Sequence, residues 1–119
     1  CFGKHIDHDN IYIKRDDLSG ASKGNCFHLY GGNKPRKLEF LLADALAHEA
    51  RTIITYGCAG SNHALATAVY AKELGLQSIL MLKHQPNSYT VRHNLLLDLA
   101  QDADIRWFPD NAVRSQAAQ

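Results

Sequence analysis

The sequence predicts an α/β fold in which a parallel sheet is flanked by helices. Three segments of strand length, rich in β-branched, aromatic or other apolar residues, occur at residues 52–56, 78–82 and 104–108. The segments between them have the spacing of amphipathic helices. Because strands that alternate with helices are joined by right-handed crossovers, we expect parallel strands with helices on both faces of the sheet.

The composition is that of an ordinary globular chain. Hydrophobic residues make up 45% of the 119 residues and charged residues 21%. The net charge of +1 predicts no strong field, so we expect neither nucleic acid nor a membrane surface as a partner. No apolar run approaches the roughly 18 residues that span a bilayer. The three cysteines, Cys1, Cys26 and Cys58, show no paired spacing, which favours a reducing cytoplasm.

The first third of the chain predicts a strand, a loop and a helix. Residues 11–14 alternate like a short strand, and residues 15–33 indicate a long loop. An amphipathic helix is expected after Pro35, because apolar residues follow the i, i+3, i+4, i+7, i+8 rule. These residues are Leu38, Leu41, Leu42, Ala45 and Leu46.

Two further helices are expected between the three strands. The first covers about residues 62–74 and ends at Gly75, a typical C-terminal cap. Thr90 is expected to cap the second helix, with apolar residues on one face. That face comprises Val91, Leu95 and Leu99. Pro109 ends the last predicted strand.

Lys34 occupies a constrained position. The segment GGNKPRKLE, at residues 31–39, places it between a two-glycine turn and a helix start. Pro35 suits the first helical position, and the residue before a proline disfavours helical dihedrals, so Lys34 is expected to be extended. A lysine held in this way suits the role of a Schiff-base lysine, which needs fixed geometry. The alternative is a solvated lysine at a helix start.

A second loop, GCAGSNH at residues 57–63, joins the first of the three strands to a helix. It lies at the carboxyl end of a strand, where ligands bind in parallel sheets. Helix N-termini favour anions, so this layout is typical of a phosphate or cofactor site. The alternative is an ordinary helix start capped by Ser61 or Asn62.

Together, three motifs resemble the family of pyridoxal-phosphate (PLP) enzymes that contains D-cysteine desulfhydrase and 1-aminocyclopropane-1-carboxylate (ACC) deaminase. They are IYIKRDDLSG at residues 11–20, GGNKPRKLE at 31–39 and SNH at 61–63 with the helix that follows. The resemblance covers about residues 11–108. It implies the small, cofactor-contacting lobe of the type II PLP fold, similar to tryptophan synthase β, with the phosphate-binding loop further downstream.

The resemblance implies roles for four residues. Lys34 is similar to the Schiff-base lysine, and Asn62 to the asparagine that donates to the ring oxygen of the cofactor. Ser61 is similar to a substrate contact that in some members is proposed to transfer a proton. His63 stands where the desulfhydrase branch often has histidine, and we expect it to bind substrate. Cys58 and Gly60, which precede the Ser-Asn pair, depart from the commoner pattern.

The implied function is the N-terminal portion of a PLP-dependent amino-acid lyase or deaminase. Such an enzyme acts by elimination or ring opening on a small amino acid and gives a 2-oxo acid and ammonia. The implied domains are an N-terminal segment, residues 1–33, and a truncated cofactor-lobe-like α/β domain, residues 34–119. A second lobe or a homo-oligomer is the partner expected beside the substrate.

Two alternatives from other classes stay open. One is a catalytically inactive α/β domain that self-associates through an exposed sheet edge. The other is a small phosphate- or nucleotide-binding domain that uses the loop at residues 57–62.

No metal site is expected. The densest cluster of ligand-type side chains is His5, Asp7, His8 and Asp9. Clusters near a chain end are more often solvated polar arms than metal centres.

Overall fold

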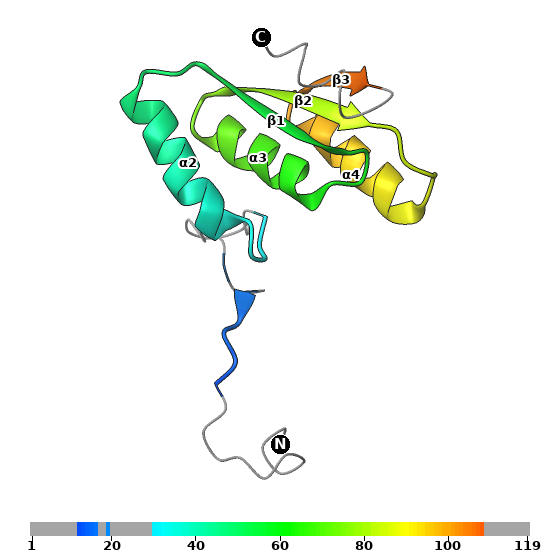
Figure 1. Ribbon diagram of the computed structural model, residues 1–119, viewed down its shortest axis with the longest axis horizontal. Helices are drawn as coiled ribbons and strands as arrows, with labels where there is room; N and C mark the ends of the chain where they lie inside the picture. The colour runs from blue at the N-terminus through cyan, green and yellow to red at the C-terminus, as the bar shows by residue number, and fades with distance from the viewer. Residues whose placement is uncertain (1–11, 17–18, 20–29, 109–119) are drawn as a thin grey trace.

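The structure, a computed structural model, describes residues 12–16, 19 and 30–108. Its elements follow one another as α2 (Pro35–Ala47), β1 (Thr52–Cys58), α3 (Asn62–Glu73), β2 (Gln77–Lys83), α4 (Tyr89–Ala100) and β3 (Asp104–Phe108). The strands form one parallel sheet in the order β1-β2-β3 (Figure 1). The predicted α/β class with a parallel sheet and flanking helices is confirmed.

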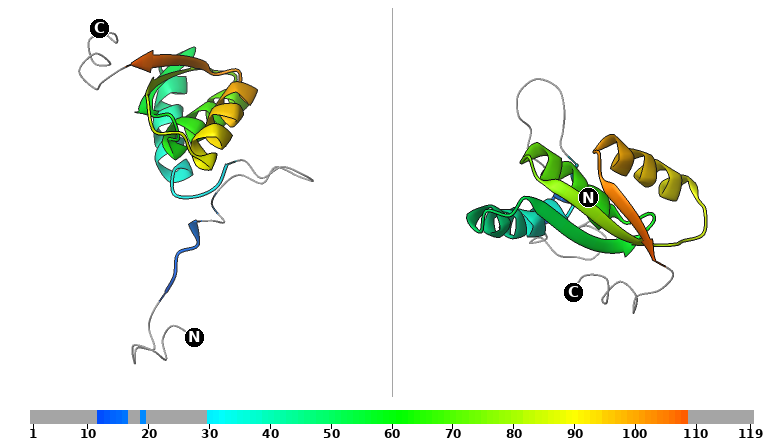
Figure 2. Two further views of the ribbon diagram at one scale, coloured as in Figure 1. Left: turned by 90° about the vertical axis from the view of Figure 1, so that its right-hand side faces the viewer. Right: turned by 90° about the horizontal axis from the view of Figure 1, so that it is seen from above.

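The three described helices lie on a single face of the sheet (Figures 1 and 2). Ile53 of β1 packs with α2 and α3, Leu80 of β2 packs with α3, and Ile105 of β3 belongs to the same cluster as Leu95 of α4. The expectation of helices on both faces is therefore wrong for the described residues. Successive right-handed crossovers that advance in one direction place their helices on the same side, and the opposite side requires a reversal of strand order.

The core lies between this helical layer and the sheet. α3 occupies its centre and contacts the sheet through small side chains, since Ala64 and Ala68 are fully buried in a cluster with strand β2. One cluster joins α3 to α2, and a second joins α3 to β2. Small residues let α3 approach the strands closely, which brings its N-terminus next to the carboxyl end of β1.

α2 buries a narrower stripe than its sequence predicts. Leu38 and Leu42 are buried, whereas Leu41 and Leu46 are 50% and 44% exposed. α2 packs mainly against α3 at the edge of the helical layer. A helix with one neighbour buries one line of side chains, so the wider apolar face stays partly in solvent.

The start and the buried face of α4 also differ from those predicted. Ser88, not Thr90, caps the helix, and its Oγ accepts a hydrogen bond from the Val91 amide at 3.2 Å. The buried positions of α4 are Val91, Asn94 and Asp98, while Leu99 is 58% exposed. The helix thus turns a partly polar face toward its neighbours.

The predicted C-terminal cap of α3 is confirmed. Gly75 has φ +73°, and the next amide, of Leu76, donates to the Ala71 carbonyl at 2.8 Å. This is the arrangement in which glycine closes a helix. Glu49 and Asp102 occupy the equivalent left-handed positions after α2 and α4, with φ 55° and 58°.

The strand predicted at residues 11–14 is not formed in its described part, and residue 11 lies outside the described residues. Tyr12 and Ile13 are 91% and 69% exposed. A strand needs a partner for its backbone groups, and the described sheet places none beside this segment. No described helix is long and apolar enough to cross a bilayer.

Candidate functional site

Lys34 directly precedes α2. Its dihedrals, φ −74° and ψ −37°, are helical, so the extended conformation expected before Pro35 is wrong. The Lys34 carbonyl accepts hydrogen bonds from the amides of Lys37 and Leu38, both at 3.1 Å, and these bonds outweigh the steric preference. The Nζ atom donates to Asn33 Oδ1 at 2.7 Å. Lys34 is therefore held by its backbone at the helix start.

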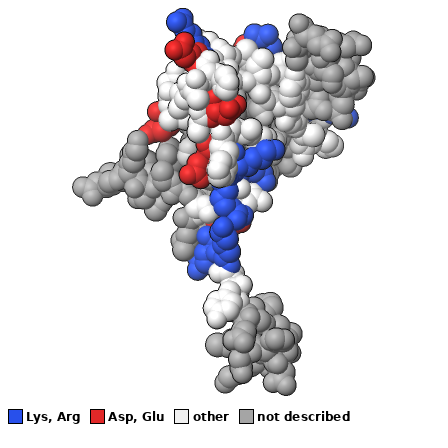
Figure 3. Space-filling model, turned by 60° about the vertical axis from the view of Figure 1, so that its left-hand side comes forward, with Lys and Arg blue, Asp and Glu red and all other residues white. Residues whose placement is uncertain are grey.

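The turn before Lys34 is tied to the N-terminal segment. Gly32 has φ +97°, a conformation that favours glycine, and its amide donates to the Asp16 carbonyl at 2.9 Å. The Asp16 carboxylate accepts from Arg36 Nη2 at 2.7 Å. Asp16 thus contacts the chain on both sides of Lys34. Figure 3 shows Lys and Arg side chains gathered where the N-terminal segment meets the body of the molecule.

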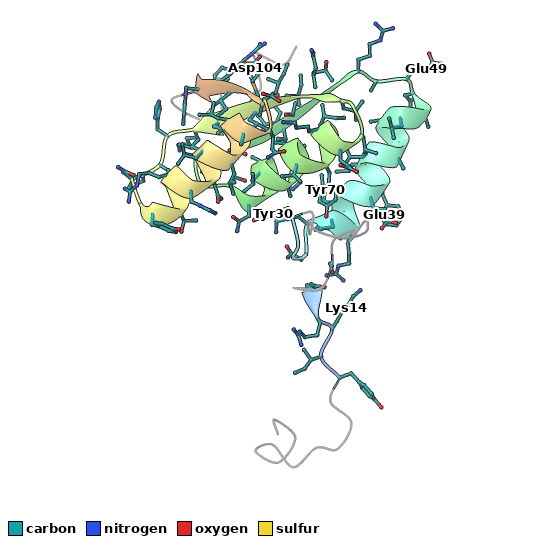
Figure 4. All side chains as sticks on the ribbon, turned by 180° about the vertical axis from the view of Figure 1, so that it is seen from behind. Lys14, Tyr30, Glu39, Glu49, Tyr70 and Asp104 are labelled. Atoms are coloured by element: carbon teal, nitrogen blue, oxygen red, sulfur yellow. The ribbon has the colours of Figure 1, made fainter. Side chains whose placement is uncertain are left out.

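The same turn is also anchored to α3. Tyr30 and Tyr70 lie side by side, and the Tyr70 hydroxyl donates to the Tyr30 carbonyl at 2.8 Å (Figure 4). Burial raises the pKa of the Tyr30 hydroxyl, and the charge of Asp98 raises this pKa further. The loop that carries Lys34 is therefore attached to the helical layer rather than projecting from it.

Ser61 caps α3, as the sequence predicts. Its Oγ accepts a hydrogen bond from the Ala64 amide at 3.2 Å. A Cβ atom placed on Gly57 would lie 2.7 Å from Ser61 Cβ and 2.8 Å from Ser61 Oγ. Glycine at position 57 is thus the residue that lets the Ser61 side chain sit against the end of β1.

The tip of the loop is held from the β2–α4 side. The Gly60 amide donates to Gln85 Oε1 at 3.2 Å. Asn94 Nδ2 donates to the Gly60 carbonyl and to Asn62 Oδ1, both at 2.9 Å. Asn62 itself is exposed at the first position of α3. Cys58, which precedes this tip, carries a free, exposed thiol.

His63 is half-buried in the first turn of α3. Burial lowers the pKa of its imidazole, and the charges of Lys37 and Lys34 lower this pKa further. The imidazole is therefore neutral at pH 7. Lys37 and Lys34 are thus close enough to His63 to influence its charge. No hydrogen bond joins Lys34 to Ser61 or Asn62 among the described residues.

Sequence reasoning missed the residues that hold the loop, Asn94 and Gln85. A signal for Asn94 was available, because Val91, Asn94 and Asp98 follow the i, i+3, i+7 spacing of a buried helix face. Both polar side chains on this face are buried, Asn94 at 4% and Asp98 at 1% exposure. Burial raises the pKa of Asp98 to about 7, and its Oδ1 has no hydrogen-bond partner among the described residues.

The donor set fits the aldehyde and ring-oxygen side of PLP. Lys34 supplies a primary amine, the chemistry that an aldehyde requires. Asn62 Oδ1 already accepts from Asn94, so its Nδ2 is the amide atom suited to donate to a ring oxygen. Lys37 and the N-terminus of α3 add the positive potential that an anionic cofactor prefers.

The described residues contain no group of three or more side chains suited to hold a metal ion. The cluster at His5, Asp7, His8 and Asp9 lies outside this part of the chain.

Comparison with curated proteins finds relatives named for ACC deaminase and for D-cysteine desulfhydrase. The chain is 44% identical over 97 residues to a Pyrococcus abyssi protein named for ACC deaminase, a match that covers 82% of this chain and 26% of that protein. It is 46% identical over 94 residues to the D-cysteine desulfhydrase of Yersinia pestis, covering 75% of this chain and 26% of the relative. The chain therefore spans about a quarter of the length of these curated relatives.

Comparison with solved structures and family models agrees. A crystal structure described as an ACC deaminase homologue superposes with a TM-score of 0.76 at 39% identity, over 98% of this chain and 33% of that chain. The family model described as "Pyridoxal-phosphate dependent enzyme" matches residues 1–119. The motifs around Lys34 and Ser61, the parallel sheet and these matches agree, and the chain belongs to the family of pyridoxal-phosphate-dependent enzymes.

Proposed function

We propose that this chain is the N-terminal, cofactor-contacting part of a PLP-dependent amino-acid lyase or deaminase of the D-cysteine desulfhydrase and ACC deaminase type. The observation that carries the proposal is the match to the pyridoxal-phosphate family over residues 1–119, with Lys34 directly before α2 and Asn62 at the start of α3. Family membership supports the cofactor, and the names of the relatives support the reaction class.

Each residue has a distinct role in this proposal. When bound, PLP withdraws electrons from the α-carbon of an amino acid. Lys34 supplies the amine that holds the cofactor and exchanges protons. Asn62 donates its Nδ2 to the ring oxygen. Ser61 binds the substrate or passes a proton through its hydroxyl. His63, which is neutral at pH 7, contacts the substrate without adding positive charge.

The substrate in this proposal is a small amino acid, and the products are a 2-oxo acid and ammonia. Residues 34–119 form the cofactor-lobe-like unit, and residues 1–33 precede it as a separate segment. A second lobe of the same protein closes the site from the other side. The free thiol of Cys58 is compatible with the cytoplasmic location that we expect.

Covalent trapping of the cofactor tests the assignment of Lys34. The protein is mixed with PLP, reduced with borohydride and digested, and the labelled peptide is identified by mass spectrometry. We expect the label on Lys34 and a background signal in Lys34→Ala, because only a positioned amine reacts efficiently with the aldehyde. Lys72→Ala is the matched control, since Lys72 lies in the last turn of α3, pairs with Asp102 and should leave the label in place. An equal label in Lys34→Ala would overturn the assignment.

Self-association is the second candidate, and a specific observation favours it. On the sheet face without described helices, Ile54 and Tyr56 of β1 are 50% and 38% exposed. This candidate predicts a molecular mass that rises with concentration in the absence of PLP, measured by sedimentation. The phosphate- or nucleotide-binding alternative instead predicts thermal protection by inorganic phosphate that is unchanged in Lys34→Ala.

A further inference from the structure

Asn94 connects α4 to the loop that carries the candidate site. It is 4% exposed and lies 32 residues after Asn62 in the sequence. Its Nδ2 atom donates one hydrogen bond to the Gly60 carbonyl and one to Asn62 Oδ1, both at 2.9 Å. A primary amide has two N–H donors, so both donors of Asn94 are used on this loop.

These two bonds determine which way the Asn62 amide points. Since Asn62 Oδ1 is taken as an acceptor by Asn94, the NH₂ group of Asn62 is directed away from α4. Asn62 is exposed, and its Nδ2 has no hydrogen-bond partner among the described residues. The side chain therefore presents donors, rather than an acceptor, to a ligand at the start of α3.

The backbone of the loop is shaped for this contact. A Cβ atom on Gly60 would lie 3.1 Å from Val91 Cγ2, one turn before Asn94 on α4. The Gly60 amide is held by Gln85 Oε1 while its carbonyl is held by Asn94. Glycine at position 60 lets α4 approach closely enough for Asn94 to reach both acceptors.

We propose that Asn94 is a positioning residue that orients the Asn62 amide so that its Nδ2 donates to an anionic ring oxygen of the bound ligand. The identity of that ligand rests on the proposed function, whereas the orientation of Asn62 does not. Asn94 acts through Asn62, while its bond to the Gly60 carbonyl holds the Asn94 amide in place, and it makes no ligand contact in this proposal.

Replacing the hydrogen-bond donor of Asn94 with an acceptor tests the proposal. Asn94→Asp at pH 8 replaces a donor with an acceptor of nearly the same shape. The Asn62 amide should then rotate and present its oxygen to the ligand. We expect PLP affinity to fall roughly ten- to a hundredfold, because a hydrogen bond to a charged group is lost. The matched control is Asn87→Asp, an exposed asparagine on the segment before α4, which should leave affinity unchanged.

A double-mutant cycle separates positioning from general damage to the fold. In an Asn62→Ala background, Asn94→Asp should change PLP affinity less than about twofold, because its effect is transmitted through Asn62. The same large loss in both backgrounds would overturn the proposal. If Asn94→Asp fails to fold, Asn94→Leu removes the donors without adding charge and is measured in the same cycle.

A measurement without cofactor keeps the inference distinct from the proposed function. The side-chain amide signals of Asn62 in a ¹⁵N correlation spectrum should shift in Asn94→Asp and stay in place in Asn87→Asp. If the unmodified protein binds no PLP but Asn62 shifts, the proposed function fails and the positioning role stands. If the Asn62 signals do not move, the positioning role is wrong whatever the protein binds.

Discussion

The ionisation of His63 shows how single residues set the character of the site. Its imidazole lies in the first turn of α3, where burial and the charges of Lys37 and Lys34 all lower its pKa. Burial is the largest of these causes. A neutral imidazole at this place provides one donor and one acceptor, which suits contact with a polar substrate.

Removing the charge that contributes most to the shift should raise the pKa of His63. In Lys37→Gln the imidazolium form loses a repulsive neighbour, so protonation becomes easier and the titration midpoint moves to higher pH. An NMR titration of the His63 ring protons measures this shift. Lys72→Gln serves as a control, because Lys72 pairs with Asp102 at 2.8 Å, and no charge of Lys72 is among the causes that shift His63. A midpoint that falls or stays unchanged in Lys37→Gln would contradict the electrostatic account.

At the scale of elements, the starts of α3 and α4 follow the same design. Ser61 and Ser88 are both extended, and each Oγ accepts a hydrogen bond from the amide three residues later. This contact satisfies one of the amides that a helix start leaves unpaired. Serine at both positions therefore determines where the polypeptide turns from loop into helix.

Two substitutions can show whether Ser88 or Thr90 caps α4. Ser88→Ala should reduce the free energy of unfolding by about 1 kcal/mol, because the Val91 amide loses its partner. Thr90→Ala lies within the first turn and should change stability by less than about 0.5 kcal/mol. Urea denaturation of both variants measures the difference. A larger loss of stability in Thr90→Ala than in Ser88→Ala would show that Thr90 caps α4.

For the whole molecule, Asp98 makes the stability of the fold depend on pH. Its side chain is 1% exposed, and burial raises its pKa from 3.8 to about 7. Since the folded state binds the proton more tightly than the unfolded state, the protonated form supports folding. This contribution is fully present below about pH 4 and is lost as the pH rises toward 7 and above.

Replacing Asp98 with a neutral side chain should remove this pH dependence. In Asp98→Asn the folded state no longer has to bury a carboxylate, so the variant should be more stable than the parent at pH 8. The expected gain is on the order of 4 kcal/mol, from about 1.4 kcal/mol for each unit of pKa. Denaturation at pH 5 and pH 8 measures it, with the exposed Asp44→Asn as control. An unchanged pH profile in Asp98→Asn would show that Asp98 is not the responsible group.

Local pattern alone determined much of the secondary structure and the motifs of the site. β3 has the predicted bounds, Asp104–Phe108, and Gly75 ends α3 because glycine accepts a positive φ. The helix start at Ser61 follows from its capping hydroxyl. These features depend on the residue itself and its near neighbours in the sequence, so the sequence predicts them.

Contacts between distant segments decided the rest. Leu41 and Leu99 belong to the predicted apolar faces, yet both are exposed because no described element covers them. Asn94 reaches Asn62 only because α4 packs against α3. Periodicity states which side of a helix is apolar, but only the neighbouring elements determine how much of that side is buried and which polar group it holds. The sequence by itself thus determined the family motifs, and the tertiary structure alone decided how the Asn62 amide is oriented at the site.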